Sequence, residues 1–353
     1  MNALFLNVLG APESDRYGLF LETANRLGVP IQHIEKDFWV CLVLDLLFNG
    51  RETNEPRLLF KGGTSLSKAY SLISRFSEDI DITVFREDLG QNITLGELEG
   101  LSGKQQRKYF ENIKNAAQQY ICHQLKPRLE KQFIDIFKQI GSHENLPSID
   151  IDSSDKSEQT LLVRFHSVLS NNNSYIIPAV KIEGGAKSAL DPHQLTSIYP
   201  YVAKDINLSD FMVKNVVTIN AERTFWDKII ILHGIRRWYD LKGELRQSGH
   251  RYSRHYYDVF KLLKSDIGKS ARCKKELASD CVRHALMFFN SASLDLKNAN
   301  PGTFSIVPNV EMQQSLRRDY KAMSNMIFGE IPNFDEVIET IIDFEKELNK
   351  QRD

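Results

Sequence analysis

Several features that would mark a specialised class of protein are missing from this chain of 353 residues. The longest apolar stretch, residues 38–48, contains Asp45 and is too short to cross a bilayer, which needs about 20 apolar residues. The four cysteines show no CxxC or Cys/His spacing of a metal site, so free thiols in a reducing compartment are expected. The first residues lack a charged region and a clear cleavage site, so we expect a cytoplasmic protein with no membrane partner.

The chain also lacks a strong charge of one sign. Its 45 Lys and Arg residues nearly balance 46 Asp and Glu residues, which leaves a formal net charge of −1. Affinity for nucleic acid would therefore have to come from a local basic patch. There is no internal repeat or low-complexity segment, and a hydrophobic content of 42% with 26% charged residues is ordinary for a globular protein.

Hydrophobic periodicity predicts an α+β protein with a mixed sheet of about four to five strands and helices before, beside and after it. Strands are expected at residues 57–60, 79–85, 160–167, 174–183 and 213–219. The other segments are expected to be a helix over 65–73, an exposed loop over 141–158 and a hairpin turn at 171–173.

Two domains are expected from this pattern. The first covers residues 1–215 and includes an N-terminal helical segment and a helical insertion around 98–140. The second covers residues 216–353, is helical, and is expected to complete an active-site cleft.

A glycine turn follows the first predicted strand and precedes a helix. Gly62 and Gly63 allow the backbone to approach a phosphate closely, and Thr64 adds a hydroxyl group. The amide groups at the start of the next helix would point toward the same place. The turn is not a Walker A loop, because no Gly-Lys-Ser/Thr ends it.

Asp79 and Asp81 share one face of the next predicted strand, with Cα atoms roughly 6.5–7 Å apart. Two such carboxylates repel each other unless a cation lies between them, and Mg²⁺ prefers oxygen ligands of this kind together with phosphates. Metal-assisted nucleotidyl transfer uses such a cluster. On their own, two acids so spaced are common and more often lie on a solvated strand face, but their position after the glycine turn makes the pattern far more specific.

Two strings in this region resemble the AbiEii/AbiGii-type toxin nucleotidyltransferases of type IV toxin–antitoxin systems, which include MenT-like proteins and belong to the DNA polymerase β-like superfamily. The strings are Lys61-Gly62-Gly63-Thr64-Ser65-Leu66-Ser67-Lys68 and Arg75-Phe76-Ser77-Glu78-Asp79-Ile80-Asp81. The resemblance implies a nucleotidyltransferase fold with Gly62, Gly63, Thr64, Ser65 and Lys68 at the nucleotide.

A later strand carries Lys181 and Glu183 on one face, and it is similar to the family's Lys-x-Asp/Glu motif. The resemblance implies catalytic roles for Asp79, Asp81, Lys181 and Glu183. Asp79, Asp81 and Glu183 would bind Mg²⁺ or Mn²⁺, and Lys181 would contact the triphosphate. An edge strand with solvated charges is the alternative interpretation of Lys181 and Glu183.

Two further motifs on helices are similar to the family. Residues 221–228 resemble its Glu-Arg-Thr-Phe-Trp-Glu-Lys string, and residues 254–258 resemble its Arg-His-x-x-Asp string. The resemblance implies nucleotide contacts from Glu222, Lys228, Arg254, His255 and Asp258. An early string, Ile34-Glu35-Lys36-Asp37-Phe38-Trp39, matches as well, and Lys36 is expected either to reach the site or to brace the sheet.

A basic and aromatic segment between Arg236 and Tyr257 is the best local candidate for an RNA surface, because phosphates favour arginine and unpaired bases stack on aromatic rings. A basic segment that balances acidic faces elsewhere is the alternative.

The resemblance implies a toxin that transfers NMP from an NTP to an acceptor, with the 3′ end of tRNA favoured, and that is neutralised by a cognate antitoxin in a toxin–antitoxin or phage-defence module. Three alternatives remain open: a protein-modifying nucleotidyltransferase, a non-catalytic NTP-binding regulatory module, and a non-enzymatic RNA-binding protein.

Overall fold

The chain divides into two compact units in the computed structural model, which describes residues 2–142, 145–169, 177–206, 210–245 and 251–350. The first unit comprises Met1–Ala69, Phe76–Thr94 and Gly100–Ile219. The second begins at Asn220 and also contains two short segments, Tyr70–Arg75 and Leu95–Glu99, which were expected to lie in the first domain.

Within the described residues, the first unit contains one sheet of seven strands in the order β3-β4-β5-β2-β1-β7-β6. The central strands are mixed in direction, since β2 pairs antiparallel with β1 and parallel with β5, and β1 pairs parallel with β7. The predicted α+β class with a mixed sheet is therefore confirmed. The strands are β1 (Leu58–Lys61), β2 (Asp79–Val84), β3 (Ser148–Ile151), β4 (Thr160–Arg164), β5 (Ala179–Glu183), β6 (His193–Ile198) and β7 (Val213–Ile219).

The expectation of four to five strands was wrong, because both edge strands escaped it. Strand β3 has four residues and lies inside the predicted loop over 141–158. Strand β6 exposes most of its residues and so has no apolar alternation to mark it. The predicted hairpin turn at 171–173 lies outside the described residues.

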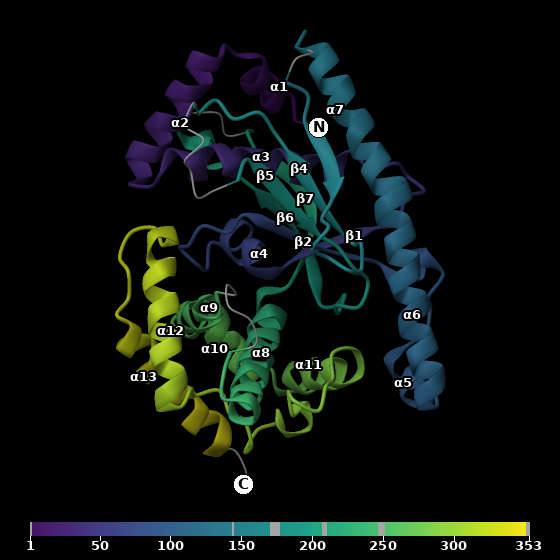
Figure 1. Ribbon diagram of the computed structural model, residues 1–353, viewed down its shortest axis with the longest axis vertical. Coiled ribbons are helices and arrows are strands. Elements are labelled where there is room, and N and C mark those ends of the chain that lie inside the picture. The colour runs from purple at the N-terminus through teal and green to yellow at the C-terminus, as the bar shows by residue number, and fades with distance from the viewer. Residues whose placement is uncertain (1, 143–144, 170–176, 207–209, 246–250, 351–353) are drawn as a thin grey trace. The chain divides into compact units, whose positions relative to one another are not determined.

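The helices of the first unit are α1 (Ala3–Gly10), α2 (Glu13–Leu27), α3 (Ile31–Asn49), α4 (Gly62–Lys68), α6 (Gly103–Tyr120) and α7 (Lys126–Gln139). Helix α3 is almost entirely buried and packs against β2, β5 and β7. A π-helical turn, Ile121–Leu125, joins α6 to α7, and Figure 1 shows the three segments as one long rod. The predicted helical insertion around 98–140 thus contains two long helices with a local change of pitch.

Helix α4 is shorter than predicted. It begins at Gly62, directly after β1, and ends at Lys68, whereas the sequence favoured a helix over 65–73. Ser71 has a φ of 53°, a left-handed backbone conformation that is incompatible with a continuing helix.

The second unit is built from helices. They are α5 (Leu95–Glu99), α8 (Ala221–Lys242), α9 (Ser253–Leu263), α10 (Asp266–Cys273), α11 (Lys275–Phe288), α12 (Val310–Met323) and α13 (Phe334–Lys350). Phe225 of α8 packs on Phe344 of α13, with ring centroids 5.7 Å apart, and the indole of Trp226 donates to the carbonyl of Ala271. No helix in the described ranges combines the length and hydropathy that a membrane crossing requires.

Candidate active site

The two predicted catalytic aspartates lie on β2, between β1 and β5 in the middle of the sheet. Asp81 stands opposite Lys61 of β1 on one side and Glu183 of β5 on the other. Asp79 stands opposite Lys181. Because directly paired residues project from the same face of a sheet, these five charged side chains share one face. The structure therefore brings together the four residues predicted to be catalytic and adds Lys61.

Asp79 is in an environment that penalises its negative charge. Burial is the largest of the causes that raise the pKa of Asp79 to about 6. The neighbouring carboxylates of Glu78, Glu183 and Asp81 add to the rise. A divalent cation among these oxygens would relieve the repulsion, so the chemistry of the donors fits a hard metal ion such as Mg²⁺.

The lysines of this face lie close to its carboxylates. Lys181 Nζ is 2.8 Å from Glu183 Oε1 and 3.6 Å from Asp152 Oδ2, and Lys61 Nζ is 3.9 Å from Asp81 Oδ1. In the described ranges, no group of three or more His, Cys, Asp or Glu side chains is already arranged around a common point for a metal. The assignment of Asp79, Asp81 and Glu183 as metal ligands stays a prediction.

The glycine turn is packed directly against the Asp81 carboxylate. Gly62 has a φ of +79°, and a Cβ atom built on it would lie 2.0 Å from Asp81 Oδ2. Glycine is required here both by the backbone conformation and by the lack of space. The backbone of the turn thus lies beside the carboxylates, and its role as a phosphate-binding loop stays a prediction.

The hydroxyl groups of the turn are occupied within the protein. Thr64 is buried, and its hydroxyl hydrogen-bonds to Ser77 at 2.8 Å and donates to the carbonyl of Asp79. Ser65 is buried and donates to the carbonyl of Gly62 at 2.9 Å. The Thr64 bonds join α4 to the start of β2 and help to position Asp79, whereas the Ser65 bond stays within the first turn of α4.

Two lysines of the family strings make buried or half-buried ion pairs. Lys68 is buried, 2.6 Å from Asp37 of α3, with its ammonium 3.8 Å from the centre of the Tyr201 ring. Lys36 is 2.7 Å from Glu78, the residue before Asp79. Lys36 therefore reaches the start of β2, whereas Lys68 connects α4 to α3.

Two of the predicted site residues of the second unit, Lys228 and Asp258, belong to one buried cluster. Asp258 of α9 is fully buried and accepts hydrogen bonds from Arg75 at 2.7 and 2.8 Å and from Lys228 of α8 at 2.7 Å. Burial alone would raise the pKa of Asp258, but Arg75 and Lys228 outweigh it and hold that pKa well below its usual range. Burial lowers the pKa of Lys228, whose carboxylate partner is shared with Arg75. Lys228 and Asp258, which come from two separate motifs, are thus joined in one ion-pair network.

The other predicted residues of this unit have different surroundings. Glu222 is 2.7 Å from Lys274 and accepts from Ser270. Burial is the main cause that lowers the pKa of His255 well below its ordinary value, and Lys228 and Arg254 contribute to the shift. His255 is consequently a neutral imidazole near pH 7.

The basic and aromatic segment is less available than the sequence suggested. Tyr239, Tyr256 and Tyr257 are buried, so they cannot stack on a base. Arg236 is 2.9 Å from Asp240, and Arg237 is 2.9 Å from Asp295. Residues 246–250, which include part of the segment, lie outside the described residues.

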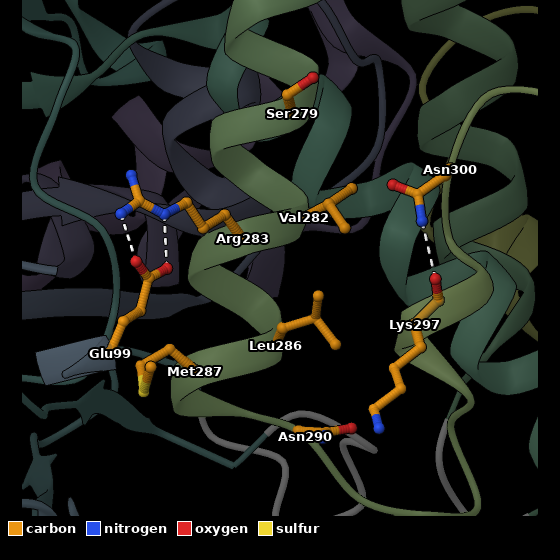
Figure 2. Close-up of a pocket in the computed structure, with 9 residues that line it drawn as sticks. All are labelled: Glu99, Ser279, Val282, Arg283, Leu286, Met287, Asn290, Lys297 and Asn300. Carbon is orange, nitrogen blue, oxygen red and sulfur yellow. Dashed lines mark hydrogen bonds and ion pairs between the residues drawn. The ribbon is translucent and has the colours of Figure 1, made fainter. Parts of the chain in front are cut away.

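A cavity of about 430 Å³ lies in the second unit, beside α11, and Figure 2 shows the residues that line it. Its wall includes the apolar side chains of Val282, Leu286 and Met287 and the ion pair between Arg283 and Glu99. None of the predicted site residues lines it. Within the part of the chain that the structure describes, the charged face of the sheet combines carboxylates, lysines and a glycine turn, and it is the candidate site.

Sequence reasoning missed three members of these clusters. Lys61 and Arg75 stand in the strings that carry the resemblance, and their position next to the glycines and the aspartates was the available signal. Asp152 lies in a stretch that the sequence predicted to be an exposed loop, and nothing in its local pattern distinguishes it.

Comparison with known proteins defines the class to which this fold and site belong. A model of the family described as nucleotidyl transferase AbiEii toxin, type IV TA system, matches residues 45–340. The class is thus that of the toxin nucleotidyltransferases. The chain belongs to the AbiEii family.

No curated protein matches the sequence significantly. Among solved structures, the chain is similar to MenT4, a nucleotidyltransferase toxin from Mycobacterium tuberculosis H37Rv, with 13% identity over 86% of this chain and 98% of that chain. The TM-score of 0.35 is too low for this likeness to support any argument.

Proposed function

We propose that this protein is a metal-dependent nucleotidyltransferase that transfers NMP from an NTP to an acceptor hydroxyl and releases pyrophosphate. The observation that carries the proposal is the charged face on which Asp79, Asp81 and Glu183 lie beside a glycine turn. Membership of the AbiEii family supports the same reaction.

In the proposed reaction, Asp79, Asp81 and Glu183 hold Mg²⁺ or Mn²⁺. When bound, this ion supplies positive charge to the phosphate oxygens and lowers the pKa of the attacking hydroxyl. The backbone of Gly62 and Gly63 and the ammonium of Lys181 bind the triphosphate. The carboxylates of Asp79 and Asp81 lie beside the glycine turn, so a cation held there would be next to the bound triphosphate, and such positioning lowers the entropic part of the barrier.

The acceptor oxygen forms a bond to the α-phosphorus while the bond from that phosphorus to the bridging oxygen of the β-phosphate breaks. The hydroxyl proton passes to Asp81, and the electron pair of the broken bond leaves with pyrophosphate. We propose the 3′ end of tRNA as the acceptor and a cognate antitoxin as the protein partner, within a cytoplasmic toxin–antitoxin system, because the family is that of type IV toxins.

The test is incorporation of each α-labelled NTP into total RNA and total protein with Mg²⁺, for the wild type and Asp81→Ala. We expect one nucleotide to label a tRNA band and the label to disappear in Asp81→Ala. The matched control is Asp343→Ala, which removes a side chain that is 78% exposed on α13. This control should keep full activity.

Two other distributions of the label would change the proposed acceptor or the proposed reaction. Label in protein alone would replace tRNA by a protein acceptor. NTP binding without label in either fraction would mean a binding module, and the proposed reaction would be wrong.

A further inference from the structure

Among the described residues, Asp152 is a carboxylate near Lys181 that belongs neither to the family strings nor to the predicted metal ligands. Its Oδ2 atom lies 3.6 Å from Lys181 Nζ, while Glu183 Oε1 lies 2.8 Å from the same nitrogen. One ammonium group therefore stands between two carboxylates, of which one, Glu183, is a predicted metal ligand.

Strand pairing explains why Asp152 reaches this place. The residue directly follows β3, and its amide donates to the carbonyl of Thr160 at the start of β4. Thr160 stands opposite Glu183, which in turn stands opposite Asp81. Asp152 thus lies at the end of a row of paired residues that includes Glu183 and Asp81, the predicted metal ligands. These residues are far apart in the sequence, so the sequence alone does not reveal the row.

The Asp152 carboxylate is held in a fixed orientation. Its Oδ1 atom accepts from the amide and the hydroxyl of Ser154 at 2.9 and 2.7 Å, which leaves Oδ2 directed to Lys181. Asp152 is 13% exposed, whereas Glu183 is 44% exposed. Asp152 is therefore the more shielded and more constrained of the two partners of Lys181.

The loop behind Asp152 is held by its own network. Asp155 accepts from Ser157, Gln159 and Thr160 through four hydrogen bonds of 2.6 to 3.0 Å. Gln159 donates to the carbonyl of Lys114 on α6. This bracing makes a large displacement of Asp152 on ligand binding costly.

The π-helical turn between α6 and α7 adds a second support. Cys122 of this turn donates from Sγ to the carbonyl of Glu158, and Ile121 lies so close to Gly184 that a Cβ atom there would be 2.5 Å from Ile121 Cδ1. Such turns occur often beside functional sites. Here the turn meets both the loop that follows Asp152 and the end of β5.

In the function proposed above, on which this inference rests, Glu183 binds a divalent cation. A cation bound there would repel the ammonium of Lys181, which must then find another anion or leave the site. We propose that Asp152 is a positioning residue: it retains Lys181 when Glu183 binds the divalent cation, so that Glu183 is free for the metal and Lys181 stays beside the triphosphate.

The test measures Mn²⁺ binding to the nucleotide-free protein by isothermal titration calorimetry. Asp152→Asn keeps the size of the side chain but removes the second carboxylate beside Lys181, so Lys181 would compete with the metal for Glu183 and the Mn²⁺ affinity should fall about tenfold. The matched control is Asp150→Asn, two residues earlier, where the carboxylate is 54% exposed and paired with Arg164. This control makes the same change of charge and should alter the affinity less than twofold.

A double-variant experiment separates an action through Lys181 from a direct effect on the metal. In Lys181→Gln, the competition for Glu183 is absent, and adding Asp152→Asn should change the Mn²⁺ affinity less than twofold. The proposal is wrong if Asp152→Asn leaves the affinity of the otherwise wild-type protein unchanged. It is equally wrong if the loss persists in the Lys181→Gln background, since Asp152 would then act without Lys181.

Folding and the proposed function are checked separately. A melting temperature close to that of the wild type shows that Asp152→Asn folds. If Asp152→Asn does not fold, Ser154→Ala replaces it as the test, because this variant removes one of the hydrogen bonds that orient Asp152. Ser154→Ala should also lower the Mn²⁺ affinity. An unchanged affinity in Ser154→Ala would then overturn the proposal. If the wild type binds no Mn²⁺, or if Asp81→Asn binds it as well as the wild type, the proposed function fails and this inference fails with it.

Discussion

The carboxylate of Asp81 occupies the space that any side chain at Gly62 would need. A Cβ atom at residue 62 would be 2.0 Å from Asp81 Oδ2, and the φ of +79° favours glycine independently of that contact. The turn and the aspartate are thus one structural feature, although 19 positions of the sequence separate residue 62 from residue 81.

Gly62→Ala is therefore expected to disable the site more than it unfolds the protein. The methyl group would displace Asp81, and a displacement of about 1 Å at a reacting centre costs roughly 100-fold in rate. The left-handed backbone adds a destabilisation of about 1–2 kcal/mol. The measurement is NMP transfer together with the melting temperature.

Gly103→Ala is the control for that substitution, because nothing lies within 4 Å of a Cβ atom at residue 103. It should leave both activity and stability unchanged. Full activity in Gly62→Ala would show that the position of Asp81 does not matter to the reaction.

Asp258→Asn is expected to destabilise the second unit strongly. The substitution leaves Arg75 and Lys228 buried without their common carboxylate, and breaking a buried ion pair costs about 3–5 kcal/mol. Denaturant unfolding measures the loss. Asp335→Asn is the comparison, because Asp335 also pairs with an arginine, Arg317, but at the exposed surface. A loss no larger than that of Asp335→Asn would contradict the structural role of the buried cluster.

Lys68 and Lys181 are expected to respond differently to replacement by methionine. Lys68→Met leaves Asp37 buried without its cation, so it should lower the free energy of unfolding by about 3–5 kcal/mol and leave the KM for NTP unchanged in the folded protein. Lys181→Met removes a cation from the charged face, so it should raise the KM for NTP roughly tenfold with little change in stability.

Steady-state kinetics and denaturant unfolding of both variants make this comparison. A raised KM for NTP in Lys68→Met, with an unchanged free energy of unfolding, would support the nucleotide contact that the sequence suggested for Lys68.

The stability of the first unit is expected to decrease between about pH 6.5 and pH 4 through His33. Burial is the main cause that lowers the pKa of His33 from 6.5 to about 4, and its ring stacks on Phe76 at 4.2 Å. In this pH range the unfolded chain binds a proton that the folded protein does not, so protonation favours unfolding. The contribution is complete above pH 6.5, and a pKa difference of this size corresponds to at most about 3 kcal/mol.

Denaturant unfolding of the wild type and His33→Gln at several pH values tests this. The difference between their unfolding free energies should decrease as the pH falls from 6.5 to 4. A difference that is independent of pH would show that His33 titrates normally in the folded protein.

The sequence by itself determined the local parts of this protein. Alternation of apolar and polar residues predicts the strand at Asp79 and the strand of Lys181 and Glu183, and the glycines predict the turn at Gly62. The strings around these residues carry the resemblance to the family. Such patterns are short, so the spacing of side chains along one strand or turn is enough to predict them.

Only the tertiary structure decided which distant residues meet. The sheet order places β5 beside β2, which aligns Glu183 with Asp81 and extends that line to Asp152. Burial of Asp258 selects Arg75, 183 positions away, as its partner. Both results depend on strand register and on the desolvation of charges in a folded interior, and neither is a property of a short segment of sequence.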